Sequence, residues 1–379
     1  MLTVHTNIRV HCSYCVGLFL KLLLARYGLG DDSVLCVDPK PRETDLGHAD
    51  GIHARTMEVL ATMGLEHEVV RQGRNFACHA EWTRTPEGLK RLVKQPFMFS
   101  PARFGQTHSL HQGRFERVLS ADLRKYVKHG VQYSTTLEMV KIDESDSEYP
   151  VVVGIRNGDN IREVRARYLV GADGAHSTVR HSMNIRMEGD VINEVWGVID
   201  FVPESDFPDV RRVARMLAGD SKLLALTIPR ERMSNGDWLC RIYVDMSEDA
   251  QDLQKQPVIV GDEQREEVRK KKADIKKDHI LAQAAKIYTP YKIVPKSNTR
   301  PVWWATYSTG QRLAEKFHIE DSKQHPRVFL VGDGKYLVTL WRYLTDHNQH
   351  AILTALAKVK DSTSASWTRI IYRGGWHSF

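Results

Sequence analysis

The order of strand and helix patterns along the chain is the feature that most limits its fold. A strand-to-helix pattern occurs at 8–28 and again at 166–180, and a buried strand reaches a turn at 326–334. Between them, 186–246 shows the alternation of β-strands, as in "NEVWGVIDFVP" and "WLCRIYVDM". This order predicts an α/β fold: a Rossmann-like dinucleotide-binding domain built from separated segments, with an inserted β-rich domain.

Composition and charge narrow the class of protein. The chain has 379 residues, of which 42% are hydrophobic and 27% charged, as in ordinary globular proteins. Its net charge is +7, and basic residues concentrate at 265–279, interleaved with acids at helical spacing. That pattern is typical of a solvated helix face, so we expect no nucleic-acid partner. The longest apolar run, 16–25, contains Lys21 and is too short to span a bilayer, so we expect no membrane association.

The cysteines indicate a reducing environment. The chain has five, an odd number, and its first seventeen residues lack the pattern of a secretory signal. We therefore expect reduced thiols and a cytoplasmic location. Cys12 and Cys15 form a CxxC motif, which is also typical of a redox pair or half a zinc site. Because no second pair stands at ligand spacing, we expect no bound metal.

Three acids stand where a dinucleotide fold holds its ligand. Asp38 ends the strand 33–38, about 20 residues after the helix start at Gly17, where a carboxylate accepts hydrogen bonds from ribose hydroxyls. Glycines in two turns would let the backbone approach a ligand closely. These turns set acids beside glycines: Asp173 with Gly174, and Asp333 with Gly332. The alternative is that all three acids merely cap or connect elements.

A cation and a phenol are predicted to share one face of a strand. If 238–244 is a strand, Arg241 and Tyr243 lie on the same side, because side chains alternate with period two. With Arg230 a few residues earlier, they would suit an anionic or phenolic ligand. The alternative is a surface salt bridge and an ordinary sheet tyrosine.

The motifs, taken together and in order, resemble the FAD-dependent aromatic hydroxylases of the p-hydroxybenzoate hydroxylase fold, specifically the phenol 2-monooxygenase branch. The resemblance runs from about Gly17 to Asp333. It rests on stretches whose order and spacing follow the family: "VLCVDPKP", "GHADGIHARTMEVLATMGL", "LHQGRFERVL", "YLVGADGAHSTVR", "VWGVIDFVPESDFPDVR", "LTIPRE", "RIYV", "KIYTPYKIV", "WWATYSTGQRLAEKF" and "RVFLVGD".

The resemblance implies a monooxygenase that uses FAD, NADPH and oxygen to hydroxylate a small phenolic or other aromatic substrate. A base that removes the phenolic proton would speed attack on the ring. By similarity, the catalytic residues are Asp50, Arg230 and Tyr243. The residues implied to bind FAD are Gly17, Asp38, Arg55, Gln112, Asp173, Gly174, Arg241, Gly332 and Asp333.

The resemblance also implies a domain layout. The first part of the FAD-binding domain covers 1–185, with an excursion near 73–107 into the substrate domain. The β-rich substrate domain covers 186–300, and 301–334 returns to the FAD-binding domain. We interpret 335–379 as a tail foreign to the family. A C-terminal thioredoxin-like domain is expected to be absent, which weakens the expectation of a homodimer.

Two family motifs are missing from the sequence. The pattern GxGxxG would place glycines at Cys12, Tyr14 and Gly17, and only the last is present. Side chains at the first two positions would obstruct a tight turn and the approach of a pyrophosphate. After Asp333 the family continues with a histidine-containing turn and a glycine-rich loop, which 335–379 lacks. As written, the chain is expected to bind FAD poorly and to be inactive.

The genetic code suggests why the second motif is missing after Asp333. Codons for 334–336 can contain a splice donor and Gln349 can contain an acceptor, and the span between them would shift the reading frame. The restored frame can encode the missing motif. Our hypothesis is therefore that 335–379 derives from a retained intron and the frameshift after it; residues before Gly17 pose a similar but weaker case. The alternative is a non-catalytic remnant that binds flavin weakly or not at all. Sequencing the spliced transcript decides between them.

Overall fold

The first sheet has the strand order of a dinucleotide-binding domain. The structure is a computed structural model that describes residues 4–12, 15–45, 49–86, 88–96, 103–218, 222–246, 270, 272–334 and 336–338. The main path of this sheet is β19 (His318–Glu320), β20 (Pro326–Leu330), β11 (Asn160–Ala172), β1 (Val4–Cys12), β2 (Val34–Val37) and β8 (Val131–Gln132). The strands from β20 to β8 are parallel. Parallel strands of this kind carry ligands at their carboxyl ends.

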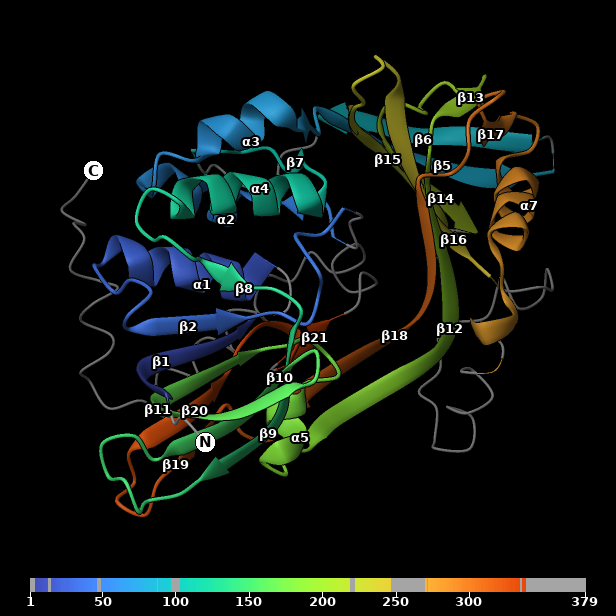
Figure 1. Ribbon diagram of the computed structural model, residues 1–379. Helices are drawn as coiled ribbons and strands as arrows, with labels where there is room; N and C mark the ends of the chain where they lie inside the picture. Colours follow the sequence, from blue (N-terminus) through green and yellow to red (C-terminus); the bar gives the residue numbers. More distant parts are fainter. Residues whose placement is uncertain are drawn as a thin grey trace, which may run out of the picture. The chain divides into compact units, whose positions relative to one another are not determined.

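Helices cover one face of the first sheet, and an antiparallel hairpin extends it. Figure 1 shows α1, α2, α3 and α4 stacked beside β1 and β2. Their bounds are α1 (Cys15–Arg26), α2 (Ala54–Thr62), α3 (Glu66–Gln72) and α4 (Gln112–Leu123). Leu22, Met57, Leu60 and Leu119 form the buried centre of this helical layer. The hairpin, β9 (Thr135–Ile142) with β10 (Val151–Asn157), pairs with β11 and packs near α5 (Thr178–Ser182).

The second sheet contains most of the β-rich middle of the chain. Its order is β21 (Tyr336–Val338), β18 (Trp303–Ala314), β12 (Met187–Phe201), β16 (Trp238–Asp245), β15 (Lys222–Arg232), β14 (Val213–Ala218), β5 (Cys78–Thr85) and β6 (Gly88–Pro96). Helix α7 (Lys277–Tyr288) covers one face. Ile199, Ile242 and Val244 of the sheet pack there against Ile280 and Tyr288 of α7. The opposite face is therefore the one that offers polar side chains.

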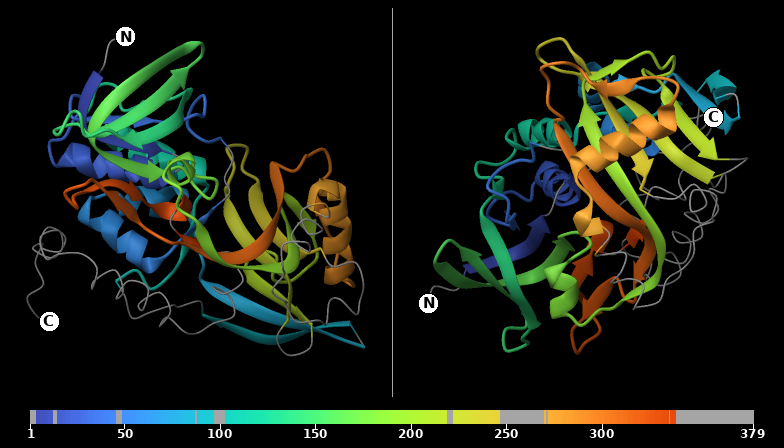
Figure 2. Two further views of the ribbon diagram at one scale, coloured as in Figure 1. Left: turned by 90° about the horizontal axis from the view of Figure 1, so that it is seen from below. Right: turned by 90° about the vertical axis from the view of Figure 1, so that its right-hand side faces the viewer.

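Short elements complete the fold. A three-stranded sheet joins β3 (Gly51–Ile52), β7 (His108–Ser109) and β4 (Arg74–Asn75), and β13 (Pro203–Ser205) pairs with β17 (Ile293–Pro295). The turn η2 (Gly332–Gly334) follows β20. Figure 2 shows the long strands β12 and β18 side by side along the molecule. Among the residues described, no helix has the length and apolar character needed to cross a membrane.

The predicted α/β architecture with a β-rich insertion is confirmed. Helix α4 ends at Leu123, and Gly130 has a positive φ of 65° in the loop that follows. The domain limits stay a prediction, although β18 belongs to the second sheet as far as Ala314. The basic segment 265–279 lies outside the described residues except 270 and 272–279, and so does the tail 335–379 except 336–338.

Candidate active site

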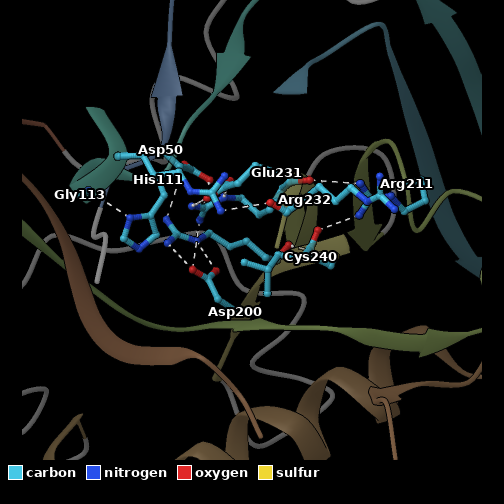
Figure 3. Close-up of polar contacts among 12 residues, drawn as sticks. Asp50, His111, Gly113, Asp200, Arg211, Glu231, Arg232 and Cys240 are labelled. Carbon is cyan, nitrogen blue, oxygen red and sulfur yellow. Dashed lines mark hydrogen bonds and ion pairs between the residues drawn. The ribbon is translucent and has the colours of Figure 1, made fainter. Parts of the chain in front are cut away.

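A group of buried charges, which we call the acid–arginine cluster, joins the residue before β3 to three strands of the second sheet, and Figure 3 shows its polar contacts. Its members are Asp50, Asp200, Arg230, Glu231 and Arg241, and none is more than 8% exposed. Asp50 precedes β3, Asp200 lies on β12, Arg230 and Glu231 on β15, and Arg241 on β16. Buried charges are costly unless they are paired, so the geometry of their pairing determines what the cluster can do.

Asp200 holds both arginines. Its Oδ1 accepts a hydrogen bond from Arg241 Nε at 2.6 Å, and its Oδ2 accepts from Arg241 Nη2 at 2.8 Å and from Arg230 Nη1 at 3.1 Å. Sheet register explains the contact, because Asp200 on β12 pairs directly with Arg241 on β16. Glu231 completes the shell of Arg230, accepting from Nε at 3.0 Å and from Nη2 at 3.3 Å. Both arginines are thus fixed in position before any ligand arrives.

Asp50 is the cluster's uncommitted carboxylate. Its Oδ2 lies 3.3 Å from Arg230 Nη1, and its Oδ1 lies 3.6 Å from Arg241 Nη1. Asp50 Oδ2 is nevertheless buried without a hydrogen-bond partner. A buried acceptor left without a partner normally costs free energy, and such exceptions call for a functional explanation. Asp50 can therefore accept a hydrogen bond from a ligand.

Tyr243 and two aromatic neighbours, Trp303 and Tyr307, lie next to Arg241. Arg241 Nη1 donates to Tyr243 Oη at 3.2 Å, which confirms that the two side chains share one face of β16. The Arg241 guanidinium lies 4.9 Å from the Trp303 ring centroid, and the ring of Tyr307 packs edge-on to Tyr243 at 6.3 Å. Burial raises the pKa of Tyr243 to about 12 despite the nearby Arg241 charge. Tyr243 therefore remains a hydrogen-bond donor at neutral pH.

The guanidinium groups stay charged throughout the accessible pH range. Burial alone would lower the pKa of Arg230 and of Arg241, but the negative charges around them, Asp50 first, raise both. Beside them, His111 is 8% exposed and caps α4, with its Nδ1 accepting from Gly113 N at 3.1 Å. Burial, followed by the charge of Arg230, lowers the pKa of His111. A neutral His111 in this tautomer carries its hydrogen on Nε2.

A second, smaller acid group lies farther along the same face of the sheet. Lys222 Nζ lies 3.2 Å from Asp245 Oδ2, and Trp196 Nε1 donates to Glu194 Oε2 at 3.2 Å. Glu194 is 5% exposed, and its Oε1 has no hydrogen-bond partner. Burial and the charge of Asp245 raise the pKa of Glu194 to about 7. The cross-strand pair Val198 and Tyr243 separates this group from the acid–arginine cluster, because strand register places that pair between the Trp196 and Asp245 pair and the Asp200 and Arg241 pair.

The cofactor end contains a different buried acid. Asp38 is 3% exposed at the carboxyl end of β2, and its Oδ1 accepts from Lys40 N at 2.9 Å. Lys40 Nζ lies 3.5 Å from Asp38 and 3.6 Å from Glu116, which is itself buried. Gln112 Nε2 donates to Glu116 Oε1 at 3.2 Å. Burial raises the pKa of Asp38, an effect that the Lys40 charge opposes.

The loop that crosses this end approaches the backbone of α4 very closely. Glu116 Oε2 accepts from Thr44 N at 2.9 Å. A Cβ on Gly113 would lie 1.8 Å from Thr44 O, so only glycine fits there. Burial, followed by the charge of Glu116, raises the pKa of Cys15 to about 12. That thiol is therefore a poor nucleophile, in contrast to the redox interpretation of the CxxC motif.

The remaining predicted cofactor residues are spread over several turns. Gly332 has a φ of 61°, and a Cβ there would lie 3.4 Å from Val16 of α1. Gly174 has a φ of 79°, while Asp173 caps α5, accepting from Ser177 Oγ at 2.5 Å and from Val179 N at 3.1 Å. The other predicted contacts lie apart from the cluster: Gly17 is buried in α1, Arg55 is 83% exposed and pairs with Glu58 at 3.1 Å, and Asp333 is exposed in η2.

The structure thus brings four predicted residues together, namely Asp50, Arg230, Arg241 and Tyr243, and it adds three that the sequence did not reveal. Asp200 and Glu231 complete the cluster, and His111 lies beside it. Glu231 adjoins Arg230 in "IPRER", but nothing in the sequence fixes the register that brings Asp200 to Arg241. Among the residues described, no group of His, Cys, Asp and Glu side chains could hold a metal ion.

Fold and site together are typical of the FAD-dependent aromatic hydroxylases. Residues 14–339 match the family model described as an FAD binding domain. A flavin-dependent oxygenase of Aspergillus ustus is 37% identical to this chain, in an alignment that covers 84% of this chain and 48% of the oxygenase. A 3-hydroxybenzoate 4-monooxygenase of Comamonas testosteroni is 30% identical, in an alignment that covers 84% of this chain and 48% of that enzyme. The chain belongs to the family of FAD-dependent aromatic hydroxylases. It spans about half the length of these curated relatives.

Solved structures support the same fold. The p-nitrophenol 4-monooxygenase of Pseudomonas putida has a TM-score of 0.65 at 18% identity, covering 96% of this chain and 82% of its own. Aklavinone-11 hydroxylase, solved with FAD and aklavinone, has a TM-score of 0.61 at 22% identity, and the match covers 89% of this chain and 58% of the hydroxylase chain.

The residues present fit FAD at the ribose end and beside η2. A buried carboxylate stands at the carboxyl end of β2, and the positive φ of Gly332 brings the backbone close to α1. The opening turn is the exception, because Cys12 and Tyr14 replace glycines of the family pattern; Tyr14 and the side chain of Cys12 lie outside the described residues.

Proposed function

We propose that the chain is the flavin- and substrate-binding part of a monooxygenase that hydroxylates a phenolic substrate with NAD(P)H and oxygen. The observation that carries the proposal is Asp50: its carboxylate lies between two arginines, and its buried Oδ2 has no hydrogen-bond partner. A phenolic hydroxyl is a donor that would satisfy it. The similarity to enzymes such as a phenol 2-monooxygenase of Aspergillus fumigatus supports the same chemistry.

The cluster's residues would activate the phenol in a defined way. Asp50 accepts the phenolic proton, because a phenolate ring is more electron-rich than a phenol ring. Arg230 and Arg241 favour the phenolate through their fixed positive charges, which lower the pKa of a nearby acid. Tyr243, kept protonated by its high pKa, donates a hydrogen bond to the phenolate oxygen. Trp303 and Tyr307 provide aromatic side chains against which a substrate ring would pack.

FAD, when bound, supplies the oxygen chemistry. Asp38 would hold its ribose and Gln112 its phosphates, with the Gly332 turn close to the flavin. Asp38 would have to exchange part of its contact with Lys40 for the ribose hydroxyls. A cytoplasmic location also belongs to this proposal.

The test replaces Asp50 with Asn, which keeps the shape and removes the base. We expect flavin content, read from visible absorbance, to stay within the range of the wild-type protein. Hydroxylation of a phenol, measured by product formation and by phenol-stimulated NADPH oxidation, should fall by about 10²-fold or more. The matched control is Asp159→Asn, an exposed acid in the β10–β11 turn, which should change neither quantity.

Two results would contradict the proposal. Equal loss of flavin and activity in Asp50→Asn would make Asp50 a structural residue. A wild-type protein that is colourless and takes up no FAD would instead support the non-catalytic remnant, which the altered opening turn favours.

A further inference from the structure

A positively charged surface surrounds Trp238 next to the acid–arginine cluster. Trp238 begins β16 and is 41% exposed. Three guanidinium carbons approach its ring centroid: Arg211 at 4.9 Å, Arg74 at 5.7 Å and Arg232 at 5.8 Å. A fourth arginine, Arg114, donates from Nη2 to Arg232 O at 3.1 Å. We call these four arginines and Trp238 the arginine–tryptophan patch.

The patch lacks the carboxylates that neutralise arginines elsewhere in the molecule. Within the described part of the chain, none of its four arginines forms an ion pair. Arg211 donates to two backbone carbonyls, Leu239 O at 2.7 Å and Arg230 O at 3.1 Å, and Arg232 Nε donates to Gly236 O at 2.9 Å. Arg74 Nε is buried without any hydrogen-bond partner. These contacts fix the guanidiniums in place and leave their charge uncompensated.

The acids nearest in sequence are already committed to other partners. Glu231 precedes Arg232 but holds Arg230 through both of its oxygens. Asp237 precedes Trp238 but lies 2.7 Å from Lys296 Nζ. Several arginines that converge on one half-exposed ring repel one another, and burial together with the charge of Arg74 lowers the pKa of Arg211. An external anion would relieve that repulsion.

The patch is joined to the candidate active site and is built from both parts of the fold. Arg74 lies on β4 and Arg114 on α4, whereas Arg232 and Trp238 belong to the second sheet. Arg211 touches the backbone of Arg230, and Figure 3 shows Arg211 on the side of the cluster opposite His111. An anion held here would lie beside the site without entering it.

We propose that the arginine–tryptophan patch binds the phosphate groups of the reduced nicotinamide nucleotide and favours NADPH over NADH. The inference rests on the proposed function, which requires such a reductant. Guanidinium groups bind phosphate oxygens in pairs, with charge-assisted hydrogen bonds. A 2′-phosphomonoester adds about −1.5 to −2 charges at neutral pH, so the phosphorylated nucleotide gains most from several unpaired arginines.

The test measures binding and turnover separately at fixed ionic strength. Calorimetric titration of adenosine 2′,5′-bisphosphate and of adenosine 5′-monophosphate into the protein measures their binding affinities without any catalysis. Arg232→Gln and Arg211→Gln should each weaken the bisphosphate about ten-fold, the effect of losing one charge-assisted hydrogen bond. They should raise KM for NADPH by a similar factor while KM for NADH changes little. Arg156→Gln, which removes an exposed arginine paired with Glu138, is the control and should change neither.

Each other outcome has a defined meaning. Unchanged bisphosphate affinity in both variants overturns the proposal and makes the patch a packing feature around Trp238. Inorganic phosphate or a short oligothymidylate that binds the patch as tightly as the bisphosphate overturns its assignment to a nucleotide reductant. If the bisphosphate binds as expected but no phenol stimulates NADPH oxidation, the patch is supported and the proposed function fails.

Discussion

The acid–arginine cluster and the arginine–tryptophan patch use the same side chain in opposite ways. In the cluster, two fully buried arginines are surrounded by three carboxylates, and Asp200 contacts both. In the patch, four arginines have no carboxylate partner within the described residues, and Arg232 and Trp238 are exposed. The two groups adjoin each other through Arg211 and the backbone of Arg230.

The difference shows which charges serve the fold and which are free for ligands. Removing water from an ion costs several kcal/mol, so a buried arginine requires counter-charges beside it in the folded state. An exposed arginine stays hydrated without an internal counter-charge and is therefore available to bind an external anion. Asp50 is the exception within the cluster, because it contributes charge without committing a hydrogen bond.

Removing Asp200, the carboxylate that both buried arginines share, should lower the stability of the protein by the largest amount. Asp200→Asn leaves Arg230 and Arg241 with too little negative charge in a water-free site. We expect the free energy of unfolding, measured by urea denaturation, to fall by about 3–5 kcal/mol. Glu138→Gln, at the exposed pair with Arg156, should lower it by no more than about 1 kcal/mol. Equal effects of the two changes would show that the cluster is not stabilised by its internal pairing.

The second acid group, which contains Glu194, should make the stability of the folded chain depend on pH. The pKa of Glu194 is about 7 in the folded chain, above its ordinary 4.5, so the folded state binds the proton more tightly. The associated stability is present below about pH 4.5 and lost as pH rises through about 7. The loss is on the order of 3 kcal/mol.

Glu194→Gln removes this titration. We therefore expect the variant to be the more stable protein at pH 8 and to approach the wild-type protein at pH 5, both followed by thermal unfolding. A pH dependence that persists unchanged in the variant would assign the titration to another group.

Changing the patch should alter stability least, and its sign should depend on salt. Arg232→Gln relieves repulsion among the arginines but loses the contact with Trp238, which is worth about 0.5–1 kcal/mol. At low ionic strength the two effects oppose each other, so the unfolding free energy should change by less than about 0.5 kcal/mol. Added salt screens the repulsion in the wild-type protein and leaves the lost contact. The variant should therefore become the less stable protein at high salt; a salt-independent difference would argue against crowding of charge.

Much of the fold was predictable because its signals are local. Period-two alternation identified the strands of the second sheet, and apolar runs that end in acids identified β2, β11 and β20. The same alternation placed Arg241 beside Tyr243, since neighbouring positions on one face follow from the pleat alone. Family motifs added Asp50, for which no local pattern exists.

The candidate site was predictable only in part because its contacts cross the chain. Asp200 and Arg241 are 41 residues apart and meet through sheet register, which no single stretch encodes. His111 follows β7, which contacts β15, and this contact between distant segments brings its ring close to Arg230. The sequence also proposed Arg55 as an FAD contact; the structure places it on an exposed face of α2, paired with Glu58, and its role stays a prediction.

The sequence by itself determined the alternation of strands and helices, the family, and the identity of the charged residues available to the site. Only the tertiary structure decided which of the arginines are neutralised and which are not. The physical reason is that the state of a charge depends on its solvent exposure and on neighbours from distant segments, and both are set only when the strands and helices have packed.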